Sequence, residues 1–182
     1  LSPDERKLGL CAASAGNHAM AVSFHAAGLS IPCTIVMPVS APLIKVKSTE
    51  DFGAKVILHG STFNDAYDHA VKLAKGQNLI YVPAFDDPAI ISGQGSCGIE
   101  ILEQLPNVDS VVVPIGGGGL ISGIAAAIKA PRPEVFILGV YSEWAEKSRQ
   151  GQLTAGSLAP LSIADGIAVK REGLITKPMM QD

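Results

Sequence analysis

The sequence lacks several features that would assign a protein to a class at once. Its 182 residues include only three cysteines, and no apolar run reaches the length of a membrane span. The cysteines lie in separate apolar segments, without a Cys-x-x-Cys pair or a nearby histidine, so a disulfide framework or a zinc site has little support. We therefore expect a protein of the reducing cytoplasm that binds no metal and contacts no membrane.

Charge is also sparse and nearly balanced. Lys and Arg number 14 against 17 Asp and Glu, which gives a formal net charge of −3. No basic cluster could neutralise a phosphate backbone, so nucleic acid is not an expected partner. The 47% of hydrophobic residues can fill the core of one α/β domain or of two small ones.

The two ends of the chain have little that marks a terminus. The first residues, LSPDERK, are charged, unlike a signal peptide, and lack an initiator methionine. The last residues, KPMMQD, follow no evident closing element. We therefore expect the chain to be an internal piece of a longer protein, with an incomplete fold.

Short β-rich apolar runs and helical stretches alternate along the chain. The runs cover residues 8–13, 33–37, 55–58, 79–82, 110–114 and 135–140. The helical stretches cover residues 16–27, 41–52, 62–75, 90–104, 120–130 and 143–150. A spacing of about 20 to 30 residues leaves room for a crossover helix, so the pattern predicts an α/β fold with doubly wound parallel sheets.

The segment VPAFDDPAIISGQG separates two parts of this pattern. Its proline, paired aspartates and glycine are typical of a linker. We therefore expect two lobes, a small one over residues 1–84 and part of a larger one over residues 85–182. In sheets of this kind ligands bind at the carboxyl ends of the strands, which directs attention to the turns there.

The first such turn is SAGNHAM, residues 14–20, where a buried strand leads into a helix. The first N–H groups of a helix have no partner inside it, so this turn can bind an anion. Ser, Asn and His add side chains that form hydrogen bonds. The alternatives are structural: Asn17 as the helix N-cap and His18 as a satisfied side chain at the helix start.

The second turn is PIGGGGLISG, with four glycines between a Val-rich strand and an Ala-rich helix. Glycines remove the Cβ atoms that would keep an anion from the N–H groups, so the turn predicts a phosphate site. A Walker loop is excluded because Leu120 and Ile121 follow the glycines, and the dinucleotide pattern G-x-G-x-x-G also fails. The structural alternative is a flexible glycine run that caps the helix.

The two turns, together with TIVMP, GAKVILHG, FDDPAIISGQG and ADGIAV, resemble the threonine/serine dehydratase branch of the fold type II, tryptophan-synthase-type pyridoxal-phosphate enzymes. The motifs occur in the order of that family, from Leu8 to Val169. The resemblance implies pyridoxal 5'-phosphate as cofactor, threonine or serine as substrate, and a homo-oligomer in the full-length form.

The resemblance also implies roles for residues in both turns. In the first, Asn17 binds the 3-oxygen of the cofactor ring. The substrate carboxylate is bound by the same turn, at Ser14, Ala15, Gly16 and His18. In the second, the cofactor phosphate is bound by Gly116, Gly117, Gly118, Gly119 and Leu120.

Several positions distinguish the branches of the family. Serine racemases have a second serine where this chain has Ala15, and cysteine synthases have threonine in place of His18. Dehydration is therefore favoured, racemisation is a weaker alternative, and GVYSE is most similar to the catabolic type of threonine dehydratase. Some members bind a divalent cation through a glutamate at the position of Tyr141. Because tyrosine replaces that glutamate here, the sequence argues against the metal site. Glu143 is expected to be a carboxylate at a helix start, where it complements the helix dipole.

The catalytic residue is the remaining difficulty. In the family, the lysine that joins the cofactor lies upstream of the Ser14 turn in a Ser-x-Lys-x-Arg-Gly segment, and none of the ten lysines here matches it. We therefore expect residues 1–182 alone to be inactive. Two further alternatives remain open: a non-catalytic binding or interaction domain, and a nicotinamide-dependent oxidoreductase, which the failed dinucleotide pattern opposes.

Overall fold

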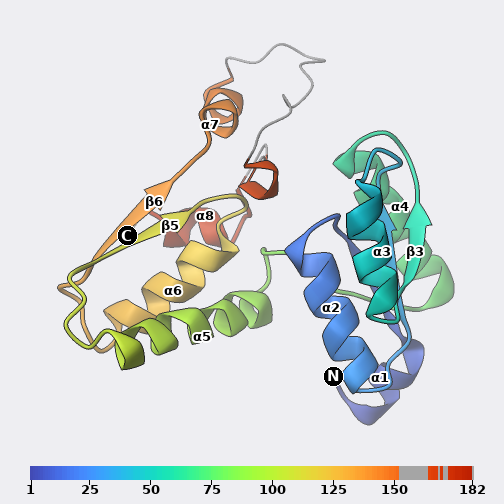
Figure 1. Cartoon of the computed structure of the whole chain (residues 1–182), viewed down its shortest axis with the longest axis horizontal. Helices are drawn as coiled ribbons and strands as arrows, with labels where there is room; N and C mark the ends of the chain where they lie inside the picture. Colours follow the sequence, from blue (N-terminus) through green and yellow to red (C-terminus); the bar gives the residue numbers. More distant parts are fainter. Residues whose placement is uncertain (152–163, 168, 170–171, 182) are drawn as a thin grey trace. The chain divides into compact units, whose positions relative to one another are not determined.

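The computed structural model of the chain describes residues 1–151, 164–167, 169 and 172–181. The chain divides into two compact units, Leu1–Ala84 and Phe85–Asp182 (Figure 1). In the described part of the chain, no helix combines the length and the apolar character needed to cross a membrane. The linker expectation fails beyond Asp87, because that side chain caps a helix that already begins at Pro88.

The first unit is built on a parallel sheet of four strands, in the order β3-β2-β1-β4. The strands are β1 (Leu10–Ala13), β2 (Cys33–Met37), β3 (Lys55–Leu58) and β4 (Ile80–Tyr81). Every residue of β1 is buried, as expected for an inner strand of a parallel sheet that is covered on both faces. Burial also raises the pKa of the Cys11 thiol to about 11, so this cysteine is an inert core residue.

Helices cover both faces of this sheet. On one face, Leu10 and Ala12 pack in a cluster that includes Ala19 and Ala26 of α2 (Asn17–Gly28) and a residue of α3 (Leu43–Asp51). On the other face, Cys11 and Ala13 pack against three alanines of α4 (Phe63–Gln77). Alternate residues of one strand thus serve opposite faces, which is the doubly wound arrangement that the sequence predicts.

One short helix in this unit was not expected. The charged residues at the chain start form α1 (Pro3–Leu8). Ser2 Oγ accepts the N–H of Glu5, and the Glu5 carboxylate accepts the N–H of Ser2. This reciprocal capping box, with proline at the start of the helix, is the local signal that could have identified α1.

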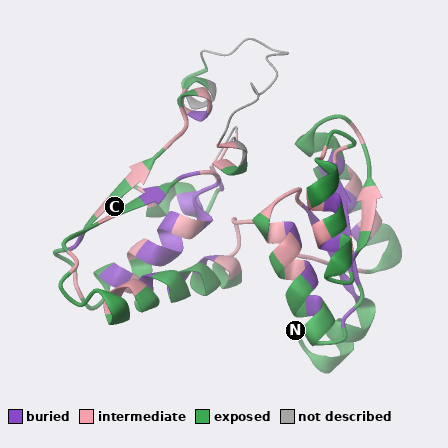
Figure 2. Cartoon of the chain, viewed as in Figure 1, coloured by how far each residue is buried: buried purple, intermediate pink, exposed green. Residues whose placement is uncertain are grey.

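The second unit contains a parallel pair of strands, β5 (Ser110–Pro114) and β6 (Phe136–Val140). Its helices are α5 (Pro88–Gln104), α6 (Gly119–Lys129), α7 (Glu143–Arg149) and α8 (Thr176–Met179), with a 3-10 turn η1 (Asp165–Ile167). Isoleucines of α6 pack with Val113 and Val135 in one core cluster. Figure 2 accordingly colours most of α6 as buried and much of α5 as exposed.

Helices α5 and α6 approach each other backbone to backbone. A Cβ atom on Gly123 would lie 2.4 Å from the carbonyl oxygen of Ile91 and 2.7 Å from the nitrogen of Gly95. A Cβ atom on Gly98 would lie 2.9 Å from the carbonyl oxygen of Ile124. Glycine is therefore required on both sides of this contact, which places α6 against α5 and leaves its N-terminus at the end of β5.

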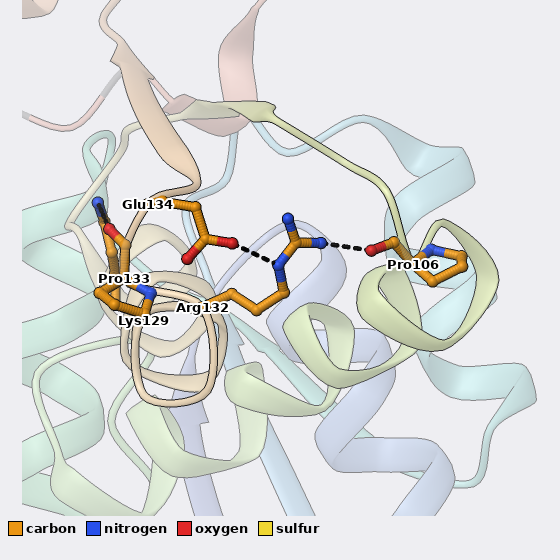
Figure 3. Close-up of polar contacts among 5 residues, drawn as sticks. All are labelled: Pro106, Lys129, Arg132, Pro133 and Glu134. Atoms are coloured by element: carbon orange, nitrogen blue, oxygen red, sulfur yellow. Dashed lines mark hydrogen bonds and ion pairs between the residues drawn. The ribbon is translucent and has the colours of Figure 1, made fainter.

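The turn from α6 into β6 is tied by polar contacts (Figure 3). Arg132 donates from Nε to a carboxylate oxygen of Glu134 at 2.8 Å and from a second nitrogen to the carbonyl of Pro106. The hydrogen bond from Arg132 lowers the pKa of Glu134. Lys129 Nζ donates to the carbonyl of Pro133 at 2.9 Å. These contacts close the connection just before β6 starts beside β5.

Candidate cofactor site

The first candidate turn lies where β1 ends. Three residues, 14–16, separate Ala13 from the start of α2. The N–H of Ser14 donates to the carbonyl of Val36 at 3.2 Å, which extends the pairing between β1 and β2 by one residue. Ser14 Oγ accepts the N–H of Gly16 at 3.1 Å and closes a tight turn. The start of α2 therefore lies at the carboxyl end of a parallel strand, as the sequence predicts.

The N-terminus of α2 has no side-chain cap. The N-cap residue is Gly16, and Asn17 is the first helical residue, with an exposed side chain. The interpretation of Asn17 as the N-cap is therefore wrong, because the helix begins one residue earlier than that interpretation requires. The first intrahelical hydrogen bond runs from Met20 N–H to the carbonyl of Gly16. The N–H groups of residues 17–19 precede it and have no partner inside the helix, so they and the helix dipole favour an anion at this end.

His18 is held by a backbone group of the same unit. Its Nε2 lies 3.1 Å from the carbonyl oxygen of Val82, just after β4, so this nitrogen carries a proton and donates. Burial lowers the pKa of His18, although the hydrogen bond to Val82 acts in the opposite direction. Burial therefore favours the neutral ring, in which the second nitrogen is an acceptor. This geometry favours backbone N–H groups, rather than the His18 ring, as donors to a carboxylate.

The second candidate turn lies where β5 ends. Gly118 is the N-cap of α6, with φ at +95°, and no side chain caps the helix. The helix begins at Gly119, one residue before the expected start at Leu120. Gly118 and Gly119 are buried, and their N–H groups have no acceptor among the described residues. Since an unpaired buried N–H is costly, this end of α6 is suited to an anionic ligand.

The glycines of this turn are packed rather than loose. A Cβ atom on Gly117 would lie 2.3 Å from a ring carbon of Phe85, and one on Gly119 would lie 2.9 Å from the Cβ of Phe85. A Cβ atom on Gly118 would lie 2.8 Å from Thr176. A Cβ atom on Gly116 would lie 3.3 Å from Val169, the last residue of the ADGIAV motif. The interpretation of a flexible capping run therefore does not describe this loop.

The structure adds residues that sequence reasoning missed. The sequence predicts a linker at Phe85 and Asp86, and it predicts no helix at Thr176, which lies in the four-residue α8. Asp87 followed by Pro88 is a helix-start signal that could have moved attention from a linker to the residues beside it. Nothing local marks Thr176, because its contact with the loop joins residues far apart in the sequence.

Tyr141 stands where the resemblance places a metal-binding glutamate in some family members, and its side chain makes a hydrogen bond within the chain instead. The Tyr141 hydroxyl donates to a carboxylate oxygen of Glu172 at 2.9 Å. Glu143 is the first residue of α7, and the hydrogen bond from Lys147 lowers its pKa. Over the ranges that the structure describes, no group of three or more His, Cys, Asp or Glu side chains could hold a metal ion.

Comparison with known proteins identifies the family. A family model described as pyridoxal-phosphate dependent enzyme matches residues 2–182. The chain belongs to this family. Its description names the cofactor that the resemblance implies.

Relatives of the chain are named as L-threonine ammonia-lyases and L-threonine dehydratases. The chain is 48% identical over 180 residues to the L-threonine ammonia-lyase of Thermotoga maritima, matching 97% of this chain and 45% of that protein. It is 42% identical to the catabolic L-threonine dehydratase TdcB of Escherichia coli K12, over all of this chain and 56% of that protein. The chain thus spans about half the length of these curated relatives.

Solved structures of the family confirm the α/β fold with parallel sheets. The processed form of threonine deaminase isoform 2 from Solanum lycopersicum matches with a TM-score of 0.89 and 39% identity, over all of this chain and 54% of that one. Maize serine racemase matches with a TM-score of 0.90 and 33% identity, over all of this chain and 56% of that one. The fold alone therefore does not separate dehydration from racemisation.

Proposed function

We propose that these residues belong to a pyridoxal-phosphate-dependent dehydratase that converts L-threonine, or L-serine, to a 2-oxo acid and ammonia. The observation that carries this proposal is the uncapped N-terminus of α6, with unpaired buried N–H groups at Gly118 and Gly119. It occurs in a chain that is 42% to 48% identical to L-threonine ammonia-lyases and dehydratases.

The donors of the glycine loop fit a phosphate group. Backbone N–H groups and the helix dipole favour an anion at this end of α6. One turn further on, Ser122 is 2% exposed, and its hydroxyl has no hydrogen-bond partner among the described residues. The protein therefore leaves donors at the start of α6 that a phosphate can use, and we assign residues 116–120 to the phosphate of the cofactor.

The Ser14 turn supplies the remaining contacts of the proposal. When bound, pyridoxal phosphate accepts the electron pair that remains when the substrate loses its α-proton. The exposed amide of Asn17 is assigned to the 3-oxygen of the cofactor ring. The N–H groups at the start of α2 are assigned to the substrate carboxylate. Ser14 Oγ accepts from Gly16 but keeps its own proton, so the hydroxyl can donate to the same carboxylate.

Ala15 supports dehydration over racemisation. Racemisation needs a proton donor on the second face of the substrate, and the methyl side chain of Ala15 cannot provide one. We further propose that the whole protein is a cytoplasmic homo-oligomer. The net charge of −3 over these 182 residues supports the proposal that they bind no nucleic acid.

The overall test is an assay of the complete polypeptide that carries these residues. We expect L-threonine to yield 2-oxobutanoate and ammonia when pyridoxal phosphate is present. Formation of D-serine from L-serine as the main product would favour the racemase alternative. Cofactor binding without turnover of either amino acid would favour the non-catalytic alternative.

Replacing Leu120 with proline tests the phosphate assignment at the backbone. Leu120 is the second helical residue, where proline is tolerated and only an N–H outside the intrahelical ladder is lost. The probe is pyridoxine 5'-phosphate, which has no aldehyde and so cannot react with lysines. We expect its affinity for the chain to fall about 10-fold or more, the worth of one hydrogen bond to a charged group. Titration followed by absorbance measures the change.

The matched control for this variant is Leu120→Ala, which shortens the same side chain and keeps the N–H. Its affinity should stay close to that of the parent chain. If the alanine and proline variants bind the probe equally well, the N–H of Leu120 does not contact the phosphate.

Asn17→Ala tests the assignment to the cofactor ring. In the complete enzyme, loss of the amide should shift the absorption maximum of the bound cofactor, because the 3-oxygen loses a hydrogen-bond partner. Threonine turnover should fall about 10-fold or more, in the range of one lost hydrogen bond to a charged group. Asn64→Ala, an exposed residue of α4, is the control. An unchanged spectrum together with unchanged turnover would remove Asn17 from the site.

A further inference from the structure

The glycine loop is held from behind by a side chain far along the sequence. Thr176, fully buried at the start of α8, donates from Oγ1 to the carbonyl oxygen of Gly117 at 2.6 Å. The same Oγ1 accepts the N–H of Gly173 at 3.0 Å. A hydroxyl has one proton, and this one is used on Gly117. Thr176 therefore contacts the loop and cannot also donate to a ligand.

The turn that carries Thr176 is itself fixed. The Asp86 carboxylate accepts N–H groups from Leu174 at 2.8 Å, from Ile175 at 2.8 Å and from Thr176 at 3.3 Å. Hydrogen bonds to a charged group are the stronger kind. Asp86 also lies beside Phe85, whose ring packs on Gly117. Phe85 thus packs on the loop directly, and Asp86 fixes the turn whose Thr176 side chain binds the loop.

The contact of Thr176 determines the direction of an N–H group on the loop. The peptide unit between Gly117 and Gly118 is planar and trans, so its carbonyl and its N–H point in opposite directions. Because Thr176 binds the carbonyl, the N–H of Gly118 points away from Thr176. That N–H is among the buried groups with no acceptor in the described part of the second unit.

We propose that Thr176 is a positioning residue that orients the Gly117 to Gly118 peptide and so directs the Gly118 N–H toward the cofactor phosphate. The inference rests on the proposed function, since it needs the phosphate to bind at this loop. The N–H of Gly173 also donates to the Gly117 carbonyl, at a longer 3.3 Å, and shares this donation with Thr176 Oγ1. Without the Thr176 hydroxyl only this longer hydrogen bond holds the peptide, and glycine allows both signs of φ, so its orientation is held more weakly. Asp86 acts one step further away, through the turn that carries Thr176.

The test compares Thr176→Val, which keeps the shape and loses the hydroxyl, with Thr176→Ser, which keeps the hydroxyl. The probes are pyridoxine 5'-phosphate and pyridoxine, which lacks the phosphate. We expect Thr176→Val to weaken binding of the phosphate ester about 10-fold and to leave binding of pyridoxine unchanged. Thr176→Ser should restore the affinity to within about threefold of the parent chain. The phosphorus NMR shift of the bound ester should change only in the valine variant.

A packing control separates this role from a general loss of structure. Met180 also packs on the loop, because a Cβ atom on Gly118 would lie 3.0 Å from its methyl group, compared with 2.8 Å from Thr176. Met180→Leu changes that packing without removing a hydrogen bond, and its affinity should match the parent chain. If Thr176→Val fails to fold by circular dichroism, Asp86→Asn replaces it. That variant should weaken binding of the ester several-fold and leave pyridoxine unaffected.

Each outcome is decisive. Equal affinity of the parent chain and Thr176→Val for the ester, or of the parent chain and Asp86→Asn where that variant replaces it, overturns the inference and leaves the proposed function standing. Failure of the serine variant to restore binding also overturns it, because packing would then explain the loss. If the parent chain binds the ester no better than pyridoxine, the proposed phosphate site fails, and the inference fails with it.

Discussion

Replacing Gly123 with alanine is expected to destabilise the second unit by about 3 kcal/mol. The added Cβ would meet the Ile91 carbonyl oxygen at 2.4 Å and the Gly95 nitrogen at 2.7 Å. Both are backbone atoms of α5, so no side-chain rotation can relieve the contact and the two helices must separate. Urea unfolding measures the change. Trp144, the one tryptophan of the sequence, lies in the second unit and reports its unfolding by fluorescence.

The matched control is Gly93→Ala in α5. A Cβ atom at Gly93 would meet nothing within 4 Å, so only the helix propensity changes. Alanine is favoured over glycine by about 1 kcal/mol in a helix interior, and this variant should be slightly more stable than the parent chain. Similar unfolding midpoints for the two variants would show that α5 and α6 do not approach as closely as the structure has them.

Residues 1–182 alone are expected to produce no 2-oxobutanoate from L-threonine, even with pyridoxal phosphate in excess. Catalysis of this kind needs a lysine that a cleft holds beside the cofactor. Of the nine lysines in the described ranges, all but Lys45 are exposed, and Lys45 is half-buried. Three of them, at positions 7, 129 and 147, bind oxygens of neighbouring residues. We therefore expect none of these nine positions to provide the nucleophile that the reaction requires.

Borohydride reduction with peptide mapping checks this expectation alongside the turnover assay. Free cofactor should leave slow adducts at several lysines, each well below one per chain. The complete polypeptide, treated in the same way, is the positive control and should give one stoichiometric adduct with turnover. A single stoichiometric adduct within residues 1–182, together with 2-oxobutanoate, would contradict both the expectation and its reasoning about the lysines.

The sequence predicts the regular elements well where the signal is local. The strands at residues 33–37, 55–58 and 110–114 have the observed bounds, because β-rich apolar runs there end at turn residues. The predicted first strand starts two residues too early, since Leu8 belongs to α1 and Gly9 follows that helix with φ at +88°. The sequence does not predict α8, because four residues carry no periodicity and the N–H groups at its start, of Ile175 and Thr176, are bound by Asp86 from another segment.

The candidate site is also predicted only where its features depend on neighbouring residues. The positions of both turns follow from local patterns, since each strand and helix is visible in the sequence. Only part of the role of the glycines can be predicted from neighbouring residues in the sequence. Their freedom to approach an anion is a property of the residues themselves, but the packing of Phe85 on Gly117 is not. That contact forms only when segments about 30 residues apart in the sequence meet, and no propensity or spacing encodes such a meeting.

The hydrogen bond between Thr176 and Gly117 also has a consequence during synthesis on the ribosome. The two residues are 59 positions apart, so at about 5 to 20 residues per second Thr176 is added about 3 to 12 s after Gly117. Until then β5, the glycines and α6 can form, but the carbonyl of Gly117 has no hydroxyl to bind. The nascent chain therefore completes its glycine loop late. If this loop binds the cofactor phosphate as we propose, we expect the cofactor to bind after translation of α8 rather than of the glycines themselves.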